Sequence, residues 1–440
     1  MSNYEIHHNN NRSHISEVPE GWKLKRLKYL TKSKKELSET GEEELLSVTE
    51  TRGIIKRKEL KSDDEPLSRS DDLIGYRLVE EGNLVNNIML VWKRGLGVSP
   101  YSGIVSPAYS VFSFSKECDP WYFNYLLRSE EYITEFRRNS TGITMSRLRL
   151  YDDSFGDVFG VLPPLNEQKI ISRYLDKKTS QIDKLISKIK KRIELLKEQR
   201  TSLINQYVTK GLDPNVEMKD SGIDWIGEIP KHWNIEVLKH ISSVELSSVD
   251  RHEYEDEKRV NICHYPDVYK NEYIDSKSVL PSGTCSDNEF EKFSLRRGDI
   301  LLTKDSESPD DIGIPTIVNE DLDNTVCGYH LAIIRMKSTD FHSEFIYRYI
   351  ESKNAKDYFY VSSSGITRFG LGKGSIENLK VVAPPEDEQK QIAHKISMVS
   401  RTTKQLSERL LARKALLKEY RQSLISSVVT GKVRVTEEII

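Results

Sequence analysis

Two short motifs in this chain of 440 residues have the spacing of groups that do chemistry. The stretch FGLGKG at 369–374 imitates a glycine-rich nucleotide loop, but no Ser or Thr follows its lysine as a phosphate-binding loop requires. The pattern Glu-x-Lys, at Glu167 with Lys169 and at Glu388 with Lys390, resembles part of a metal-dependent nuclease site. Each pair falls in the first turn of an expected helix, where the helix dipole already favours a carboxylate. We therefore predict no cofactor loop and no catalytic site at either motif.

Other signatures of catalysis are missing from the sequence as well. A methyltransferase motif of the NPPY or DPPY type does not occur, because the two Pro-Pro pairs are followed by Leu165 and Glu386. The ten histidines show no HExxH spacing, and the four cysteines form no CxxC pair. We therefore expect no metal and no cofactor in this chain. Scattered cysteines are typical of a reducing compartment.

Composition indicates a globular protein without a membrane span. The chain is 37% hydrophobic with a mean hydropathy of -0.56, and no apolar run approaches the roughly 18 to 20 residues that cross a bilayer. The polar segment at 1–17 lacks the apolar centre of a signal peptide. We expect a disordered arm at 1–17 and a cytoplasmic protein.

The chain repeats itself. Residues 163–211 align without a gap with 384–432 at 18 identities in 49 positions, which marks the two segments as copies. A second pair of related segments opens each half, VPEGWKLKRLKYL at 18–30 and IPKHWNIEVLKHI at 229–241. The order of constant, variable and constant segments, present twice, suggests two domains with different targets on copies of one scaffold.

Charge follows the repeat. The net charge of -2 is unusual for an autonomous nucleic-acid binder. Lys and Arg exceed Asp and Glu by eight in 169–210 and again by eight in 390–432, so the remainder of the chain carries a charge of -18. Basic charge is thus concentrated on the repeated tails, whereas most of the variable segments are acidic, as at 62–66 and 253–257.

Each repeated tail is predicted to form one long helix. A Pro pair stops the preceding strand, Asn166 and Asp387 are suitable N-caps, and no Gly or Pro follows until Gly211 and Gly431. The alternative is two amphipathic helices in separate cores. Helices of this length and charge outrun a single domain, so we predict that they pack on each other as an antiparallel coiled coil. The seam that we draw through them is Ile182, Leu185, Ile189, Arg192, Leu196, Gln199 and Leu203, with Thr403, Leu406, Leu410, Arg413, Leu417, Tyr420 and Leu424.

The two variable regions are predicted to be compact α/β domains of the same plan. Each contains β-rich runs broken by Gly and Pro, such as 103–112 and 298–303. An aromatic-rich helix follows in each, and each region closes with a Gly-Ile-Thr loop, at 140–150 and 363–374. Equivalent elements in equivalent order indicate that the variable regions are structural copies.

These features together resemble the specificity subunit of a type I restriction-modification enzyme. The resemblance extends from about 18 to 433 and rests on the paired PxxW starts, GIVSPAY at 103–109, the two PPxxEQK tails and the helix ends with KExRxSLI and VT. It implies two α/β target recognition domains and two long conserved helices in a pseudo-twofold arrangement. Each domain would read one half of a bipartite DNA site, and the chain itself would not be catalytic.

The resemblance also implies partners. Two methyltransferase subunits would dock on the helices and methylate adenine in double-stranded DNA with S-adenosylmethionine, and two restriction motor and nuclease subunits would add ATP- and Mg-dependent cleavage. The helices would set the spacer between the half-sites. The expected boundaries are a disordered arm at 1–17, target recognition domain 1 at 18–160, the central conserved helix at 161–212, target recognition domain 2 at 213–381 and the C-terminal conserved helix at 382–440.

Candidate contact residues follow from residue type and position. DNA bases are read by Arg, Lys, Asn and Gln, and phosphates by basic and hydroxyl groups on loops. The DNA-binding candidates are Lys93, Arg94, Ser99, Tyr101, Ser102, Arg147 and Arg149 in the first domain, and Lys304, Ser306, Arg368 and Lys373 in the second. Arg200 and Arg421, on nearly identical helix ends, are the candidates for docking the methyltransferase subunits.

Two other functional classes stay open from the sequence. One is a coiled-coil scaffold or regulator that reads no DNA sequence, which the negative net charge favours. The other is a fused restriction or methyltransferase enzyme, which would need the motifs that the chain lacks.

Overall fold

The computed structural model describes residues 6–8, 15, 17–60, 73–144 and 147–439. The chain divides into two compact units, one formed by Met1–Ile189 with Leu411–Ile440 and the other by Lys190–Leu410. Each unit therefore contains one variable region and a part of each long helix. Within the described residues, none of the helices has the length and apolarity that spanning a bilayer requires.

The first unit is built around a four-stranded antiparallel sheet. Its order is β4 (Thr31–Lys34), β11 (Tyr109–Phe114), β8 (Leu84–Asn87) and β9 (Leu96–Val98). Smaller strand pairs border this sheet, namely β3 (Lys23–Arg26) with β12 (Phe159–Leu162), β5 (Leu46–Thr49) with β6 (Gly53–Lys56), and β7 (Arg77–Val79) with β10 (Gly103–Val105). Helices α2 (Pro120–Leu127) and α3 (Glu130–Arg138) follow the sheet.

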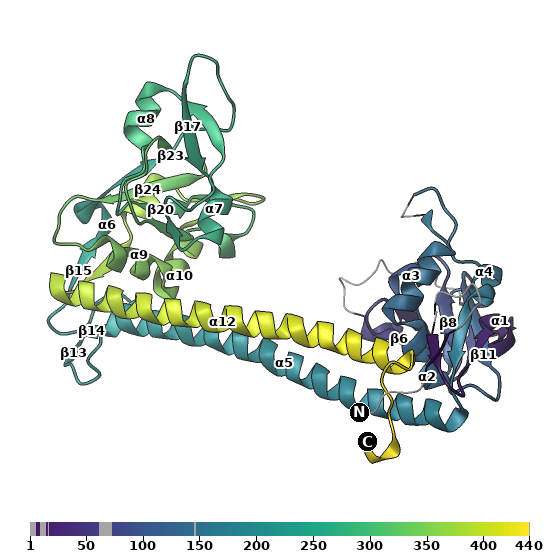
Figure 1. The fold of residues 1–440 in the computed structure, drawn as a ribbon. Coiled ribbons are helices and arrows are strands. Elements are labelled where there is room, and N and C mark those ends of the chain that lie inside the picture. The colour runs from purple at the N-terminus through teal and green to yellow at the C-terminus, as the bar shows by residue number, and fades with distance from the viewer. Residues whose placement is uncertain (1–5, 9–14, 16, 61–72, 145–146, 440) are drawn as a thin grey trace. The chain divides into compact units, whose positions relative to one another are not determined.

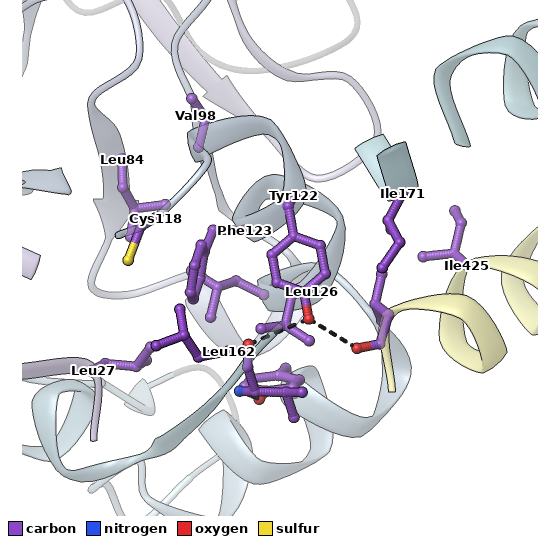
Figure 2. Packing of buried hydrophobic residues seen from close by; sticks show 14 of the residues in the cluster. Leu27, Leu84, Val98, Cys118, Tyr122, Phe123, Leu126, Leu162, Ile171 and Ile425 are labelled. Carbon is purple, nitrogen blue, oxygen red and sulfur yellow. Dashed lines mark hydrogen bonds between the residues drawn. The ribbon is translucent and has the colours of Figure 1, made fainter. Parts of the chain in front are cut away.

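Helix α2 supplies the centre of the first core. Asp119 caps it by accepting a hydrogen bond from the Tyr122 amide at 2.8 Å, and Pro120 occupies its first turn, where a missing N–H costs nothing. Tyr122 and Phe123 are fully buried. The Tyr122 hydroxyl donates to the carbonyl oxygens of Val161, at 3.2 Å, and Val429, at 3.0 Å. Figure 2 shows Tyr122 within this core, with dashed lines from its hydroxyl. The recognition domain is thereby bonded to the end of the last long helix.

The second unit repeats this plan with a larger sheet. Its five strands lie in the order β16 (Ser242–Leu246), β24 (Leu331–Met336), β20 (Ile300–Thr303), β22 (Pro315–Val318) and β18 (Tyr273–Ile274). A separate three-stranded sheet is formed by β19 (Ser282–Cys285), β17 (Lys258–Cys263) and β23 (Thr325–Cys327). With α8 (Asp287–Phe293) it packs on a second core, which it shares with residues of the five-stranded sheet such as Leu301 and Ile333. Helices α9 (Ser343–Glu351) and α10 (Lys353–Ser362) correspond to α2 and α3. The predicted α/β fold of both variable regions is confirmed.

Part of the amino-terminal arm forms a strand. Residues of β1 (Ile6–His8) pair antiparallel with β2 (Glu17–Pro19), which leads into the PxxW start. The prediction of disorder throughout 1–17 is wrong for these residues, because the backbone of β2 offers them a pairing edge. Most of the other arm residues, and the acidic segment at 62–66, lie outside the described part of the chain.

Helices α5 (Leu165–Lys210) and α12 (Glu386–Val429) are the two long helices, and they run antiparallel (Figure 1). In the first unit Arg421 lies opposite Asp183, with 3.1 Å between Nε and Oδ1. In the second unit Arg200 lies opposite Ser400, with 2.9 Å between Nε and Oγ. The predicted antiparallel coiled coil is confirmed.

Both helices begin two residues earlier than the predicted N-caps require, at Leu165 and Glu386. The carbonyl oxygens of Pro164 and Pro385 already accept hydrogen bonds from the amides four residues later, at 3.1 and 3.0 Å. Asn166 and Asp387 therefore lie in the first turn and are not the N-caps that the sequence predicted.

The predicted seam is correct at every second position. Ile182, Ile189 and Leu196 are buried, but Leu185 is 43% exposed while its neighbour Ile186 packs on the core. The same shift occurs in α12, where Leu406, Arg413 and Tyr420 are exposed. A heptad alternates steps of three and four residues, and the sequence prediction took these steps in the reverse order. Positions 200 and 421 thus belong to the seam, whereas 192 and 413 face outward.

The repeated sequence motifs meet at one junction in each unit. In the first unit, the indole N–H of Trp22 donates to Glu167 Oε2 at 3.1 Å. Gly431, just past the end of α12, lies against the same residue: a Cβ there would come within 3.1 Å of the Trp22 ring and 2.2 Å of Pro19. Only glycine fits this close approach at its φ of +78°.

The second unit repeats the junction with the helices exchanged. Trp233 donates to Glu388 Oε2 at 3.0 Å, and Gly211, just past the end of α5, would place a Cβ 3.3 Å from the Trp233 ring. Each PxxW start therefore binds the beginning of one long helix and contacts the end of the other. The Glu-x-Lys pattern has a structural explanation, because its glutamate accepts the tryptophan N–H.

The glutamine of each PPxxEQK tail joins the helix to its recognition domain. Gln168 has no exposed surface; its Oε1 accepts from the Asp119 amide at 2.7 Å, and its Nε2 donates to the carbonyls of Glu117 and Pro163 at 2.9 and 2.8 Å. Gln389 makes the same three bonds, to His342 N, Asp340 O and Pro384 O, at 2.9, 3.1 and 2.9 Å. These bonds also align the two units residue by residue, with Asp119 equivalent to His342.

Replacing Gln389 by Leu should lower the free energy of unfolding by about 3 kcal/mol, because one amide and two carbonyls lose their partners in a buried place. The shift is measured by urea denaturation followed through tryptophan fluorescence. Gln391→Leu, two residues along on the exposed face of α12, is the matched control and should change the free energy by less than about 0.5 kcal/mol. Equal effects of the two substitutions would show that the glutamine bonds contribute nothing.

Candidate nucleic-acid interface

In the first unit, the Gly-Ile-Thr segment folds into a short loop closed by paired backbone bonds. Thr141 and Arg149 exchange N–H to carbonyl bonds, both at 2.9 Å. Gly142 has a φ of +155°, and a Cβ there would come within 2.6 Å of the Arg147 carbonyl oxygen, so the loop requires glycine. The loop lies beside the segment that follows β8, because the Leu150 amide donates to the Ile88 carbonyl at 2.9 Å.

The second unit has the same loop in the same place. Ser364 and Gly370 exchange backbone bonds at 3.1 and 2.9 Å, and a Cβ on Gly365 would lie 1.9 Å from the Arg368 carbonyl oxygen. The Leu371 amide donates to the Lys304 carbonyl at 2.8 Å, which joins this loop to the segment after β20. Arg368 therefore lies on the same loop of the second unit as Arg147 and Arg149 do in the first. Lys304 lies on the segment beside that loop.

The tips of both loops present an isoleucine to solvent. Ile143 is 101% exposed and Ile366 is 94% exposed, and they occupy equivalent positions. The two loops therefore share an exposed apolar tip, although the domains that carry them differ in sequence. The sequence prediction missed these residues, although the shared Gly-Ile-Thr pattern was the signal that could have found them.

Basic and aromatic side chains gather beside the loop of the second unit. His330 Nδ1 and Lys304 Nζ lie 3.1 and 3.0 Å from Asp305 Oδ2, and Arg368 Nη2 lies 3.3 Å from His330 Nε2. Burial alone would raise the pKa of the Asp305 carboxyl, but the hydrogen bonds from His330 and Lys304 hold it below its usual range. Tyr265 packs edge-on against His330, with ring centroids 5.7 Å apart. Lys304, Ser306 and Arg368 lie close together, since β21 (Asp305–Ser306) pairs with β25 (Phe369–Gly370). Their contact with DNA stays a prediction.

The first unit carries an exposed basic surface at the corresponding place. Arg147 and Arg149 are exposed on the loop. Lys93 Nζ and the guanidinium of Arg137 lie 4.9 and 5.9 Å from the ring centroid of Trp92, on the segment after β8. Cations held over an aromatic face next to exposed arginines are suited to a nucleic-acid backbone.

Five predicted contact residues have other surroundings. Ser99 is fully buried and donates to the Tyr101 carbonyl at 2.6 Å, so the prediction that it contacts DNA is wrong. Tyr101 packs on the small core of β5 and β6, with Lys56 over its ring at 5.0 Å. Arg94 forms an ion pair with Glu130. Two of the remaining predictions lie on the surface in local contacts: Ser102 accepts from the Glu81 amide at 3.3 Å, and Lys373 lies 3.4 Å from Glu245.

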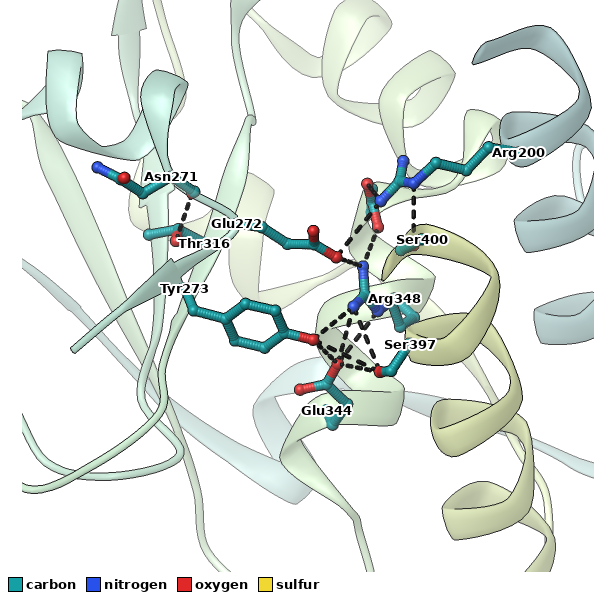
Figure 3. Close-up of polar contacts among 10 residues, drawn as sticks. Arg200, Asn271, Glu272, Tyr273, Thr316, Glu344, Arg348, Ser397 and Ser400 are labelled. Atoms are coloured by element: carbon teal, nitrogen blue, oxygen red, sulfur yellow. Dashed lines mark hydrogen bonds and ion pairs between the residues drawn. The ribbon is translucent and has the colours of Figure 1, made fainter. Parts of the chain in front are cut away.

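The predicted docking residues Arg200 and Arg421 lie at the joints between helix and recognition domain. Figure 3 shows Arg200 directed toward a network around Arg348, which has no exposed surface. Arg200 Nη2 lies 2.7 Å from Glu351, and Arg348 lies 2.6 Å from Glu272 and 3.0 Å from Glu344. Arg421 is held by Asp183. These contacts give both arginines a role inside the chain, and their contact with a partner stays a prediction.

Comparison with known proteins agrees with this geometry. Residues 260–413 match the family described as the type I restriction modification DNA specificity domain. Over 436 residues the chain is 24% identical to the type I restriction enzyme MjaVIII specificity subunit of Methanocaldococcus jannaschii, covering 96% of this chain and 95% of that one. It is 20% identical over 341 residues to the type I restriction enzyme EcoKI specificity subunit of Escherichia coli strain K12, covering 76% and 68% of the two chains.

Solved structures have the same fold. A chain from a structure concerned with complex assembly and conformational transition of the type I R-M system matches with a TM-score of 0.70 at 13% identity, over 94% of this chain and 99% of that one. The HsdS subunit from Thermoanaerobacter tengcongensis matches with a TM-score of 0.56 at 14% identity, over 94% and 98%. The chain thus shares the fold of these solved structures, and its residues 260–413 match the type I restriction modification DNA specificity domain. The resemblance to the specificity subunits of these enzymes is thereby confirmed.

Replacing Arg348 by Met should destabilise the second unit by about 4 kcal/mol, because three buried or half-buried glutamates would lose their common partner. Chemical denaturation measures the loss. Lys353→Met, which removes an exposed lysine paired with Asp357 at the start of α10, is the matched control and should cost less than about 1 kcal/mol. A stable Arg348→Met variant would mean that the network does not hold the domain on the helices.

Proposed function

We propose that this chain is the non-catalytic specificity subunit of a type I restriction-modification complex, and that each unit reads one half of a bipartite site in double-stranded DNA. The observation that carries the proposal is the repeated loop pair. Both units bring a Gly-Ile-Thr loop against the segment after the equivalent strand, with basic and aromatic side chains beside it. Both loops are closed by paired backbone bonds, while the side chains that they present differ, as two different half-sites require.

Several features of the surface support DNA rather than another ligand. Arg368, Arg147 and Arg149 can reach phosphates or the edges of guanine, and an exposed isoleucine can contact a thymine methyl group or a base step. The net charge is -2, and the basic excess lies on the repeated tails, outside the variable regions. We therefore expect weak and strongly salt-dependent DNA binding by the isolated chain, with partner subunits adding positive charge around the duplex.

Replacing Arg147 and Arg149 together by Ala should relax recognition of one half-site and leave the other intact, since the two loops belong to different units. The reconstituted methyltransferase complex is supplied with a library of DNA targets, and methylated adenines are mapped. We expect a loss of discrimination of about 1 to 3 kcal/mol at one or two base pairs. Arg368→Ala is the matched variant and should affect the opposite half-site. If either variant changed both half-sites together, two independent readers would be excluded.

The helices offer a repeated docking surface for the methyltransferase subunits. Leu185 and Leu416 are 43% and 64% exposed in the first unit, and Leu406 and Leu195 are 37% and 45% exposed in the second. These residues are copies of each other in the alignment, with Leu185 equivalent to Leu406 and Leu195 to Leu416. The antiparallel register places the two leucines of each unit near the same level. Two equal apolar patches suit two copies of one partner.

Replacing Leu195 and Leu406 by Ser should weaken the docking of one methyltransferase subunit of the two. Light scattering of the purified complex should show loss of one subunit mass, while the first unit keeps its partner. Val361→Ser, an 80% exposed residue on α10 in the same unit, serves as the control and should leave the mass unchanged. An intact complex in the leucine variant would place the docking surface elsewhere.

The remaining functions are proposed for the complex. S-adenosylmethionine would be bound by the methyltransferase subunits, and ATP and Mg by two restriction subunits, all in the cytoplasm. The antiparallel helices would set the spacer between the half-sites. The second candidate, a scaffold that reads no sequence, is favoured by the negative charge alone; equal methylation of random duplexes would support it.

A further inference from the structure

A cavity of about 500 Å³ lies in the first unit where the recognition domain meets the helix pair. Its walls come from the turn between β5 and β6, the segment after β8, helices α2 and α3, and the facing surfaces of α5 and α12. Five cationic side chains and three carboxylates line it. They are Arg52, Arg94, Arg128, Lys418 and Arg421, with Glu50, Glu130 and Asp183.

The internal repeat shows what occupies the same place in the second unit. Arg421 is the copy of Arg200, and Arg128 is the copy of Glu351, since each lies nine residues beyond the equivalent positions Asp119 and His342. In the second unit, Arg200 is neutralised from within, by Glu351 at 2.7 Å and Glu272 at 3.5 Å. In the first unit, the position of that glutamate holds another arginine. The joint that is self-neutralised in one unit is therefore cationic in the other.

The charge of Arg128 is held by carbonyl oxygens. Its guanidinium donates to the carbonyls of Arg94, at 2.9 Å, of Glu50, at 3.0 Å, and of Leu96. Burial, with further contributions from the charges of Arg94 and Arg421, lowers the pKa of Arg128 to about 10. A lowered pKa is expected for a buried cation that has too little negative charge around it.

Two buried polar atoms of lining residues lack hydrogen-bond partners among the described residues. Ser129 is 4% exposed and its Oγ is unbonded, whereas its copy Ser352 donates to the Tyr349 carbonyl at 2.6 Å. Arg421 Nε lies 3.1 Å from Asp183 Oδ1, but without the geometry of a hydrogen bond. Buried donors without acceptors are rare in folded proteins and indicate a missing acceptor group.

We propose that this cavity binds a dianionic phosphate group, carried by inorganic phosphate or by a small phosphate ester. Arginine forks match the oxygens of such a group, and the Ser129 hydroxyl and Arg421 Nε supply further donors. The lining carries two more cations than carboxylates, which a dianion balances. A DNA phosphodiester carries a single charge and would balance only one of them. The site is independent of DNA reading, and occupancy would neutralise the joint of the first unit as Glu351 does in the second.

Isothermal titration of the full-length chain, without DNA and at constant ionic strength, tests the site. Inorganic phosphate and adenosine monophosphate are titrated separately, and we expect saturable binding of at least one of them. Tighter binding of the nucleotide would identify an ester as the ligand, and tighter binding of phosphate would identify the free ion. Succinate, a dianion with carboxylate groups, should bind about tenfold more weakly; equal affinity for succinate would overturn the assignment to phosphate.

Three variants locate the binding. Arg421→Gln and Lys418→Gln should each weaken it about tenfold or more. Lys418 is exposed, so we expect the Lys418→Gln variant to fold. It therefore tests the site even if Arg421→Gln fails to fold. Arg413→Gln, on the outward face of the same helix and outside the cavity, should bind as the unaltered chain does. The proposal is overturned if neither ligand binds, if Lys418→Gln binds normally, or if Arg413→Gln loses binding equally.

Discussion

The architecture depends on a junction where a tryptophan, a glutamate and a glycine meet, once in each unit. The indole N–H of Trp22 or Trp233 is satisfied by the glutamate at the start of one long helix, and its ring lies close to a glycine of positive φ at the end of the other. An unbonded indole N–H in this place would cost about 1 to 3 kcal/mol. The constraint couples three segments that are far apart in sequence. It explains why these residues are shared by the two halves, whereas the surfaces between them diverge.

Much of this architecture could be predicted because the sequence contains periodic patterns of residue types. The repeat, the uninterrupted helices and the alternation of strands and helices depend on local rules, and the structure agrees with them. The seam was wrong at alternate positions because a heptad can be drawn with its steps in either order, and only packing decides between Leu185 and Ile186. Ser99 illustrates a second limit. A serine between two strands is the usual surface residue, and its burial follows from a hydrogen bond across its own turn.

The exposed isoleucines show the opposite limitation. Sequence reasoning for DNA contacts searches for donors and acceptors, so Ile143 and Ile366 were assigned to no role. Their exposure becomes meaningful only when two independent loops have the same tip. The difference in charge between the two joints could not be predicted from the sequence either. The bonds of Gln168 and Gln389 are needed to align the two domains, and only this alignment shows that Arg128 stands where the second unit has a glutamate. Comparison of a protein with its own second copy thus identifies features that neither copy reveals alone.

The division of the chain between the units has a consequence for biosynthesis. The second unit is one continuous stretch, Lys190–Leu410, whereas the first is assembled from Met1–Ile189 and Leu411–Ile440. During translation the second unit is therefore complete while the first still lacks the segment of α12 that covers its core, including Ile425 and Val428. Domains usually fold in the order of their synthesis. Here the unit whose synthesis begins first must wait for Leu411–Ile440 before its core can close, although the whole second unit is made in between.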